Sequence, residues 1–128
     1  MNMLIGIFLL LHGLVHLWYL TLSQRLVKFQ PEMGWTGESW LLSNILSDST
    51  TRSLASVLFT VAAAAFLVSG VGVFFRTEWV RPVLVGSAVF SSAILILYWD
   101  GGMQMLVQKG LIGLLINVAI LIFILLQK

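Results

Sequence analysis

Four long apolar stretches alternate with polar segments along this chain. They cover residues 3–22, 54–75, 82–99 and 106–126. A helix needs about 20 apolar residues to cross roughly 30 Å of hydrocarbon. An open strand would leave its backbone groups without partners in lipid, so each stretch is predicted to be a helix. The pattern predicts an all-α fold: one transmembrane domain over residues 1–128, forming an integral membrane four-helix bundle that runs up-down-up-down.

The connections between these stretches differ in length. The two later connections are short, which predicts tight helical hairpins. The first connection has roughly thirty residues, which is long for a structureless loop. Within it, residues 37–46 are predicted to form a short helix after Thr36. We expect this segment to be an interfacial helix that anchors the loop, the alternative being a lid over a pocket at the mouth of the bundle.

Composition supports the bilayer as the natural solvent of the chain. Hydrophobic residues make up 59% of it and charged residues only 9%, whereas soluble domains carry about 25% charged residues. The net charge is +2, without a basic stripe or a glycine-rich phosphate loop, so no nucleic-acid partner is expected. Because there is no cysteine, disulfides, thiolate catalysis and cysteine-ligated metals are excluded.

A few polar residues interrupt the apolar stretches. His12 and His16 lie four residues apart and share one helix face. Counted from helix ends on the same side of the membrane, Asn117 matches His12 in depth. Gly113 likewise matches His16 and leaves room for an imidazole. Polar groups at membrane depth usually face the bundle interior, so we predict a candidate ligand-binding core of His12, His16 and Asn117, with Asp100 at its mouth.

This polar core is compatible with several kinds of chemistry. Neutral histidines and an asparagine can satisfy one another in a purely structural network. A histidine can also donate to an oxygen of a lipid-like or quinone-like ligand, or take part in proton transfer. Metal or haem is a further interpretation, but zinc sites normally use three or four ligands, and both histidines lie on one helix. No metal, cofactor or catalytic residue is therefore assigned.

The first and last thirds of the chain resemble a known group of proteins. The run His12-Gly13-Leu14-Val15-His16-Leu17 resembles an HGxxHL signature of uncharacterised small bacterial four-span membrane proteins. Their last third is similar to the pattern Trp99-Asp100, Lys109-Gly110, Gly113 and Asn117. The chain thus loosely resembles the DoxX-like group. That resemblance implies a subunit of a membrane oxidoreductase that delivers electrons to quinone, and it marks the same four polar residues.

Together these patterns predict a multi-pass protein of the plasma membrane, specifically a bacterial inner membrane. We expect a non-catalytic subunit, or a binding protein for a lipid-like or quinone-like ligand in a polar intramembrane site. The alternative is a membrane oxidoreductase component that uses quinone or a histidine-bound metal. Expected partners are membrane lipid and such a ligand, with a larger membrane complex or a homo-oligomer as the candidate assembly.

Overall fold

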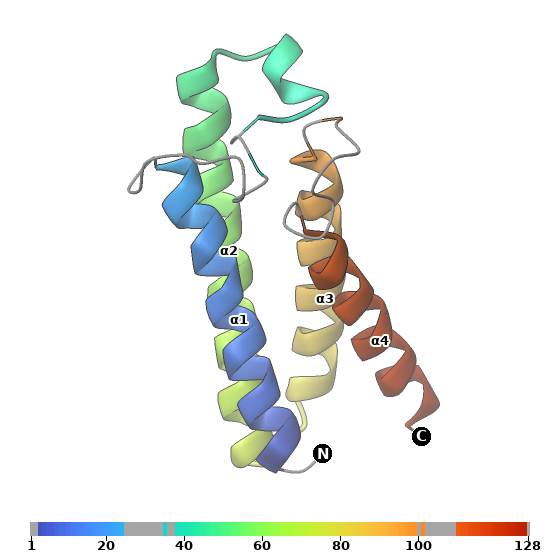
Figure 1. The fold of residues 1–128 in the computed structure, drawn as a ribbon. Coiled ribbons are helices and arrows are strands. Elements are labelled where there is room, and N and C mark those ends of the chain that lie inside the picture. Colours follow the sequence, from blue (N-terminus) through green and yellow to red (C-terminus); the bar gives the residue numbers. More distant parts are fainter. Residues whose placement is uncertain (1–2, 25–34, 36–37, 100, 102–109, 128) are drawn as a thin grey trace.

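The chain folds into four α-helices without a strand in the part that the computed structural model describes, which is residues 3–24, 35, 38–99, 101 and 110–127 (Figure 1). The helices are α1 (Met3–Ser23), α2 (Asp48–Phe74), α3 (Val80–Leu97) and α4 (Ile112–Leu126). The predicted all-α four-helix architecture is confirmed. The second helix begins at Asp48 rather than at the predicted residue 54, and the predicted start of the last helix lies outside the described residues.

The helices run alternately in opposite directions. Figure 1 shows α1 lying along α2, and α4 crossing beside α3. The first and last helices therefore have their outer ends on the same side of the molecule, as predicted. We call the end where α1 begins and α4 finishes the terminal end, and the opposite end the loop end.

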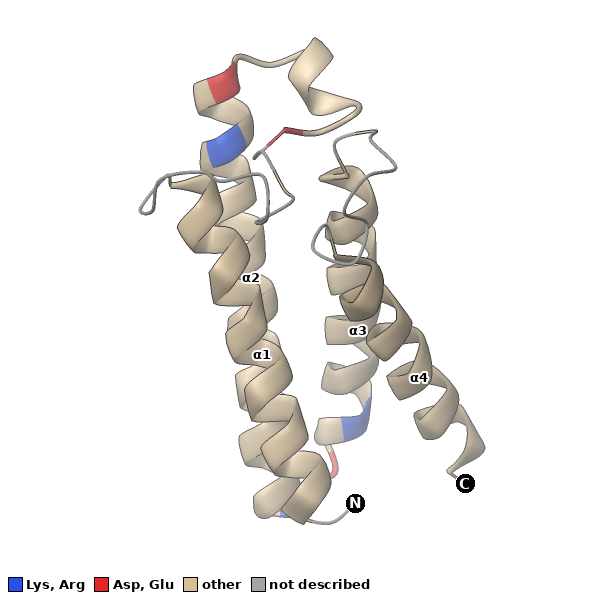
Figure 2. Ribbon diagram, in the orientation of Figure 1, with Lys and Arg blue, Asp and Glu red and all other residues tan. Residues whose placement is uncertain are grey.

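Three of the helices, α1, α2 and α3, are long and apolar enough to cross a membrane, judged by length and composition. The fourth, α4, is also apolar but has only 15 residues in its described part. Figure 2 shows the coloured charges at the ends of the helices and in the segments between them. The middle of the described bundle thus carries no Lys, Arg, Asp or Glu, which is the charge distribution of a membrane-embedded fold.

Glycines bring α1 close to α2. A Cβ atom added at Gly13 would lie 3.1 Å from the Ala63 carbonyl oxygen, and one added at Gly70 would lie 3.0 Å from the Gly6 oxygen. Small residues at such crossings let membrane helices gain close van der Waals contact, because lipid supplies no hydrophobic force between them. The close approach at Gly13 thus determines how the adjacent His12 lies against α2.

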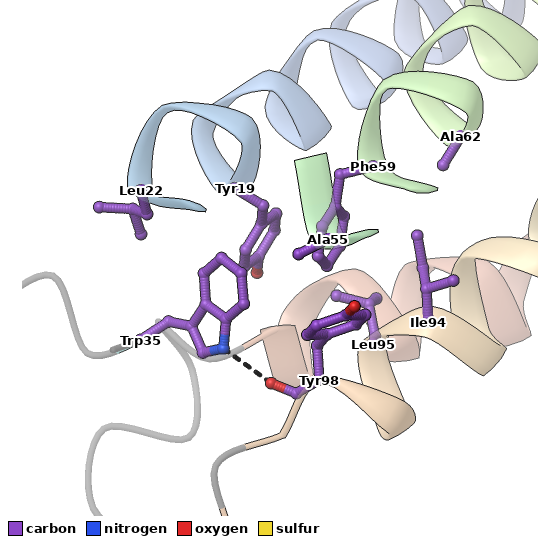
Figure 3. Close-up of a cluster of buried hydrophobic side chains, with 9 residues drawn as sticks. All are labelled: Tyr19, Leu22, Trp35, Ala55, Phe59, Ala62, Ile94, Leu95 and Tyr98. Carbon is purple, nitrogen blue, oxygen red and sulfur yellow. Dashed lines mark hydrogen bonds between the residues drawn. The ribbon is translucent and has the colours of Figure 1, made fainter. Parts of the chain in front are cut away.

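Trp35 closes the loop end of the bundle. Its side chain is 1% exposed and packs among Tyr19, Phe59 and Tyr98 (Figure 3). The indole Nε1–H donates to the Tyr98 carbonyl oxygen at 2.7 Å. Trp35 therefore lies in the mouth of the bundle.

The segment predicted as an interfacial helix adopts a different local structure. Residues 36 and 37 lie outside the described residues, and residues 38–46 contain only a 3-10 turn, η2 (Leu42–Asn44). The reason is that its polar groups are used elsewhere. Ser39 Oγ donates to the Leu97 carbonyl oxygen, and Trp40 Nε1–H donates to that of Ile96. The segment thus caps the carbonyls that every helix leaves unpaired at its C-terminus.

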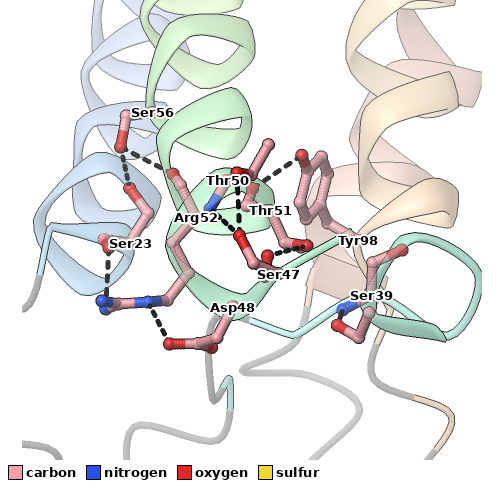
Figure 4. Close-up of polar contacts among 10 residues, drawn as sticks. Ser23, Ser39, Ser47, Asp48, Thr50, Thr51, Arg52, Ser56 and Tyr98 are labelled. Atoms are coloured by element: carbon pink, nitrogen blue, oxygen red, sulfur yellow. Dashed lines mark hydrogen bonds and ion pairs between the residues drawn. The ribbon is translucent and has the colours of Figure 1, made fainter. Parts of the chain in front are cut away.

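The start of α2 is tied to the end of α1 by polar side chains (Figure 4). Ser47 is the N-cap and accepts the Thr50 backbone N–H, as serine commonly does at this position. Arg52 pairs with Asp48 at 3.1 Å and also donates to the Ser23 carbonyl oxygen at 3.1 Å. These contacts hold the α1–α2 pair together at its loop end.

Candidate functional site

Four side chains from three helices form a closed hydrogen-bonded network in the middle of the bundle. His12 and His16 come from α1, Ser91 from α3 and Asn117 from α4, and all four are at most 5% exposed. His12 Nε2 lies 2.9 Å from Asn117 Oδ1, and Asn117 Nδ2 lies 2.9 Å from Ser91 Oγ. Ser91 Oγ lies 2.6 Å from His16 Nε2, and His16 Nδ1 lies 2.9 Å from the His12 carbonyl oxygen. The network therefore begins and ends at His12.

Donor and acceptor roles follow from this closed arrangement. The Asn117 oxygen only accepts, so His12 donates from Nε2–H. The Asn117 amide donates to Ser91, whose own hydroxyl hydrogen is then free to donate to His16 Nε2. His16 accepts at that nitrogen and donates from Nδ1–H to the His12 carbonyl oxygen. All four hydrogen bonds form with both imidazoles neutral, and the neutral state avoids the cost of a charge buried at membrane depth.

Aromatic rings surround the two histidines. The Phe66 ring meets His12 edge-on with ring centroids 4.7 Å apart, and it also lies 5.3 Å from His16. Phe8 stacks parallel to His12 at 5.9 Å. These rings give the network apolar surroundings, in which its hydrogen bonds are stronger than they would be in water.

One ring nitrogen of the network remains available. Among the described residues, His12 Nδ1 makes no hydrogen bond, whereas both nitrogens of His16 are engaged. Every fully buried side-chain nitrogen and oxygen in the described part of the chain has a partner. His12 as a whole is 5% exposed. In the neutral tautomer fixed above, this nitrogen accepts a hydrogen bond.

An apolar groove adjoins the network on the side of the terminal end. It has a volume of about 230 Å³ and lies between α1, α3 and α4. All the residues that line it are apolar: Ile5, Phe8, Leu9, Leu84, Ile116, Ala119, Ile120 and Phe123. Phe8 also stacks on His12, and Ile116 precedes Asn117 in α4. A hydrocarbon chain in this groove would therefore lie next to the polar network.

The predicted site residues have different outcomes. The expected meeting of His12 and Asn117 is found. Gly113 does not accommodate His16, because an added Cβ there would meet Leu95 at 3.4 Å and no imidazole. The position beside His16 is taken by Ser91 of α3, which was not among the predicted site residues. Asp100 lies outside the described residues, so its expected place at the mouth stays a prediction.

The ligand set does not favour a metal at the two histidines. In the described part of the chain, no group of three or more His, Asp or Glu side chains is close enough to hold a metal ion. Both nitrogens of His16 are already used by Ser91 and by the His12 backbone. A metal bound by the pair would have to break the contact with Ser91 and find ligands elsewhere.

Comparisons of this chain with protein-family models, with curated proteins and with solved structures find no match. The resemblance to the DoxX-like group therefore stays a prediction from short motifs.

Proposed function

We propose that this chain is a small non-catalytic membrane protein that binds a lipid-like or quinone-like molecule inside the bilayer. The observation that carries the proposal is the apolar groove beside the His12–Asn117 contact. The groove suits an acyl or isoprenoid tail, since ligand pockets are mostly apolar with a few placed polar groups. His12 offers the polar contact for the head group, through its unengaged Nδ1 nitrogen.

Two head-group chemistries fit His12. A hydroxyl, as in a quinol or an alcohol, can donate to Nδ1 and leave the network intact. A carbonyl, as in a quinone, must instead compete with Asn117 Oδ1 for the Nε2–H. Competing for this proton would leave a buried amide oxygen without its donor, at a cost of about 1–3 kcal/mol. The proposal therefore favours a hydroxyl-bearing head group over its carbonyl analogue.

The proposal also includes the membrane topology and location. The 15 described residues of α4 span about 22 Å at 1.5 Å per residue, less than the hydrocarbon thickness. The predicted stretch 106–126 is long enough, and Asn117 is completely buried against the network. We assign α4 to a fourth span and the protein to a bacterial plasma membrane. A non-catalytic role fits because every side-chain nitrogen and oxygen of the network except His12 Nδ1 already has a hydrogen-bond partner. The oxidoreductase alternative stays a prediction from the sequence.

The test is native mass spectrometry on protein extracted gently from its own membrane, with the bound molecules identified by their fragments. Ala119 lines the groove, so Ala119→Trp fills it, whereas Ala93 is also an exposed alanine and lies on α3 outside the groove. The proposal expects an acyl or isoprenoid compound on the wild type and on Ala93→Trp, and its loss from Ala119→Trp. A compound retained equally by both variants, or no compound on the wild type, would contradict the proposal.

A further inference from the structure

A second cavity lies at the terminal end of the bundle, where α2 turns into α3. It has a volume of about 390 Å³ and is lined by residues of the two helix ends and of the turn between them, among them Arg76, Glu78 and Arg81. None of its lining residues belongs to the apolar groove or to the polar network. This cavity is therefore separate from the apolar groove and the polar network, and its lining is charged.

The two arginines carry unused hydrogen-bond donors. The Arg76 guanidinium makes no hydrogen bond or ion pair with any described residue, and Arg81 uses Nη2 to donate to the Ile124 carbonyl oxygen at 2.9 Å. Each guanidinium has five N–H donors in a planar fork. Glu78 lies in the same lining, yet within the described chain it forms no ion pair with either arginine. The cavity lining thus carries a net charge of +1 with most donors free.

Arg76 has a backbone conformation that is unusual for an arginine. Two hydrogen bonds close the end of α2, from Arg76 N to the Val73 oxygen at 3.2 Å and from Thr77 N to the Gly72 oxygen at 3.3 Å. This is a Schellman motif, in which the residue with positive φ is usually glycine. Arg76 has a φ of 52°. A side chain kept in a conformation that glycine adopts more easily indicates a role for the side chain itself.

A membrane-spanning α3 would place the cavity near the phospholipid head groups. The 18 residues of α3 span about 27 Å, so its first turn falls near the edge of the hydrocarbon. Two apolar side chains flank the turn and face outward: Phe75 is 75% exposed and Trp79 is 44% exposed. Tryptophan is enriched at membrane interfaces, where its ring sits beside the phosphates of the lipid.

From these observations we infer that the cavity binds the phosphodiester of an anionic phospholipid. Arg76 and Arg81 donate to the phosphate oxygens, for which the guanidinium fork has matching geometry. Glu78 reduces the charge of the lining to +1, which suits a head group with one negative charge better than one with several. Basic pockets between membrane helices bind anionic head groups in this manner. This site does not depend on the proposed function, because the groove and the network contribute nothing to it.

The test measures lipid retention on the full chain reconstituted in phosphatidylcholine mixed with phosphatidylglycerol. Native mass spectrometry then counts each lipid bound after release from the bilayer. Arg76→Gly and Arg76→Gln are the primary variants, and Arg52→Gln is the matched control because Arg52 lies at the loop end and is paired with Asp48. We expect the preference for phosphatidylglycerol to fall roughly tenfold in both Arg76 variants and to stay unchanged in Arg52→Gln.

Arg76→Gly relieves the backbone strain, so a loss of lipid in this variant cannot be attributed to misfolding; helicity and thermal unfolding of each sample verify this. Unchanged retention in the Arg76 variants, or an equal loss in Arg52→Gln, would overturn the inference. A further arm titrates inorganic phosphate into protein held in phosphatidylglycerol. Retained phosphatidylglycerol supports the lipid head group, whereas complete displacement by millimolar phosphate would assign the site to a free anion and overturn the lipid assignment.

Discussion

Ser91 is the residue through which α3 joins the polar network, and Ser91→Ala tests that network with a minimal change. The substitution removes one oxygen and two hydrogen bonds, and it leaves Asn117 Nδ2–H and His16 Nε2 without partners. Hydrogen bonds between membrane helices contribute about 0.6 kcal/mol on average and up to about 1.7 kcal/mol each. Two such bonds give an expected loss of about 1–3 kcal/mol in the free energy of unfolding.

The adjacent serine provides the control. Ser92 Oγ donates to the Ala88 carbonyl oxygen of its own helix, so Ser92→Ala breaks no contact between helices. Its expected effect is below about 0.5 kcal/mol, the usual range for substitutions away from buried networks. The assay is reversible unfolding in mixed micelles by added sodium dodecyl sulfate, followed by tryptophan fluorescence and circular dichroism. Equal stability losses in the two variants, or no loss in Ser91→Ala, would show that Ser91 does not join α3 to the other helices.

Three further substitutions, the first with a control variant of its own, have outcomes that thermal unfolding in micelles can measure. Gly72→Ala is expected to lower the free energy of unfolding by about 1–3 kcal/mol, because the added Cβ would lie 2.5 Å from Val80 Cγ2. Gly86→Ala is the control: nothing lies within 4 Å of its added Cβ, so it should be neutral or slightly stabilising. Equal effects of the two substitutions would contradict the close packing at the α2–α3 turn. Trp35→Phe keeps an aromatic ring at the bundle mouth but removes the indole N–H that donates to the Tyr98 and Glu38 carbonyl oxygens, together with part of a buried ring system, so a loss of at least about 1 kcal/mol is expected. An unchanged Tm would contradict the packing and hydrogen bonding described at the mouth. Arg76→Gly is expected to raise stability by about 1 kcal/mol, and a lowered Tm would argue against backbone strain at that residue.

The helices and the contact of His12 with Asn117 could be predicted from the sequence. Apolar length defines a helix in lipid, and counting residues from the ends of antiparallel helices places side chains at equal depth. This reasoning needs only the rise per residue of a straight helix. It succeeded for His12 and Asn117 because both face the bundle interior at the same level.

Depth alone does not say which neighbouring helix a side chain faces. Gly113 was expected beside His16, but that face of α4 meets Leu95, and His16 turns to Ser91 on α3 instead. Serine is common in membrane helices and usually bonds to its own helix, as Ser92 does. Nothing in the local sequence distinguishes the serine that joins a network from the one beside it.

The loop between α1 and α2 could not be predicted for a related reason. An apolar run with a capping threonine favours a helix locally, but the described residues of the run instead bond to the last carbonyls of α3. Those carbonyls belong to the end of α3, more than fifty residues further along the chain. Leu97, for example, accepts from Ser39 at a separation of 58 residues. A tertiary contact of this kind outweighs local helix propensity.

Within the described residues, the closed neutral network leaves one imidazole nitrogen, His12 Nδ1, free for a ligand. Nitrogen-15 solid-state NMR of the two histidines in bilayers at neutral pH tests it most directly, because the two nitrogens of each ring have distinct shifts in each tautomer. We expect opposite neutral tautomers, with the proton on Nε2 in His12 and on Nδ1 in His16. We also expect a bound quinol to shift the His12 Nδ1 signal alone. The same tautomer in both rings, or an imidazolium in either, would contradict the network and the proposed binding site with it.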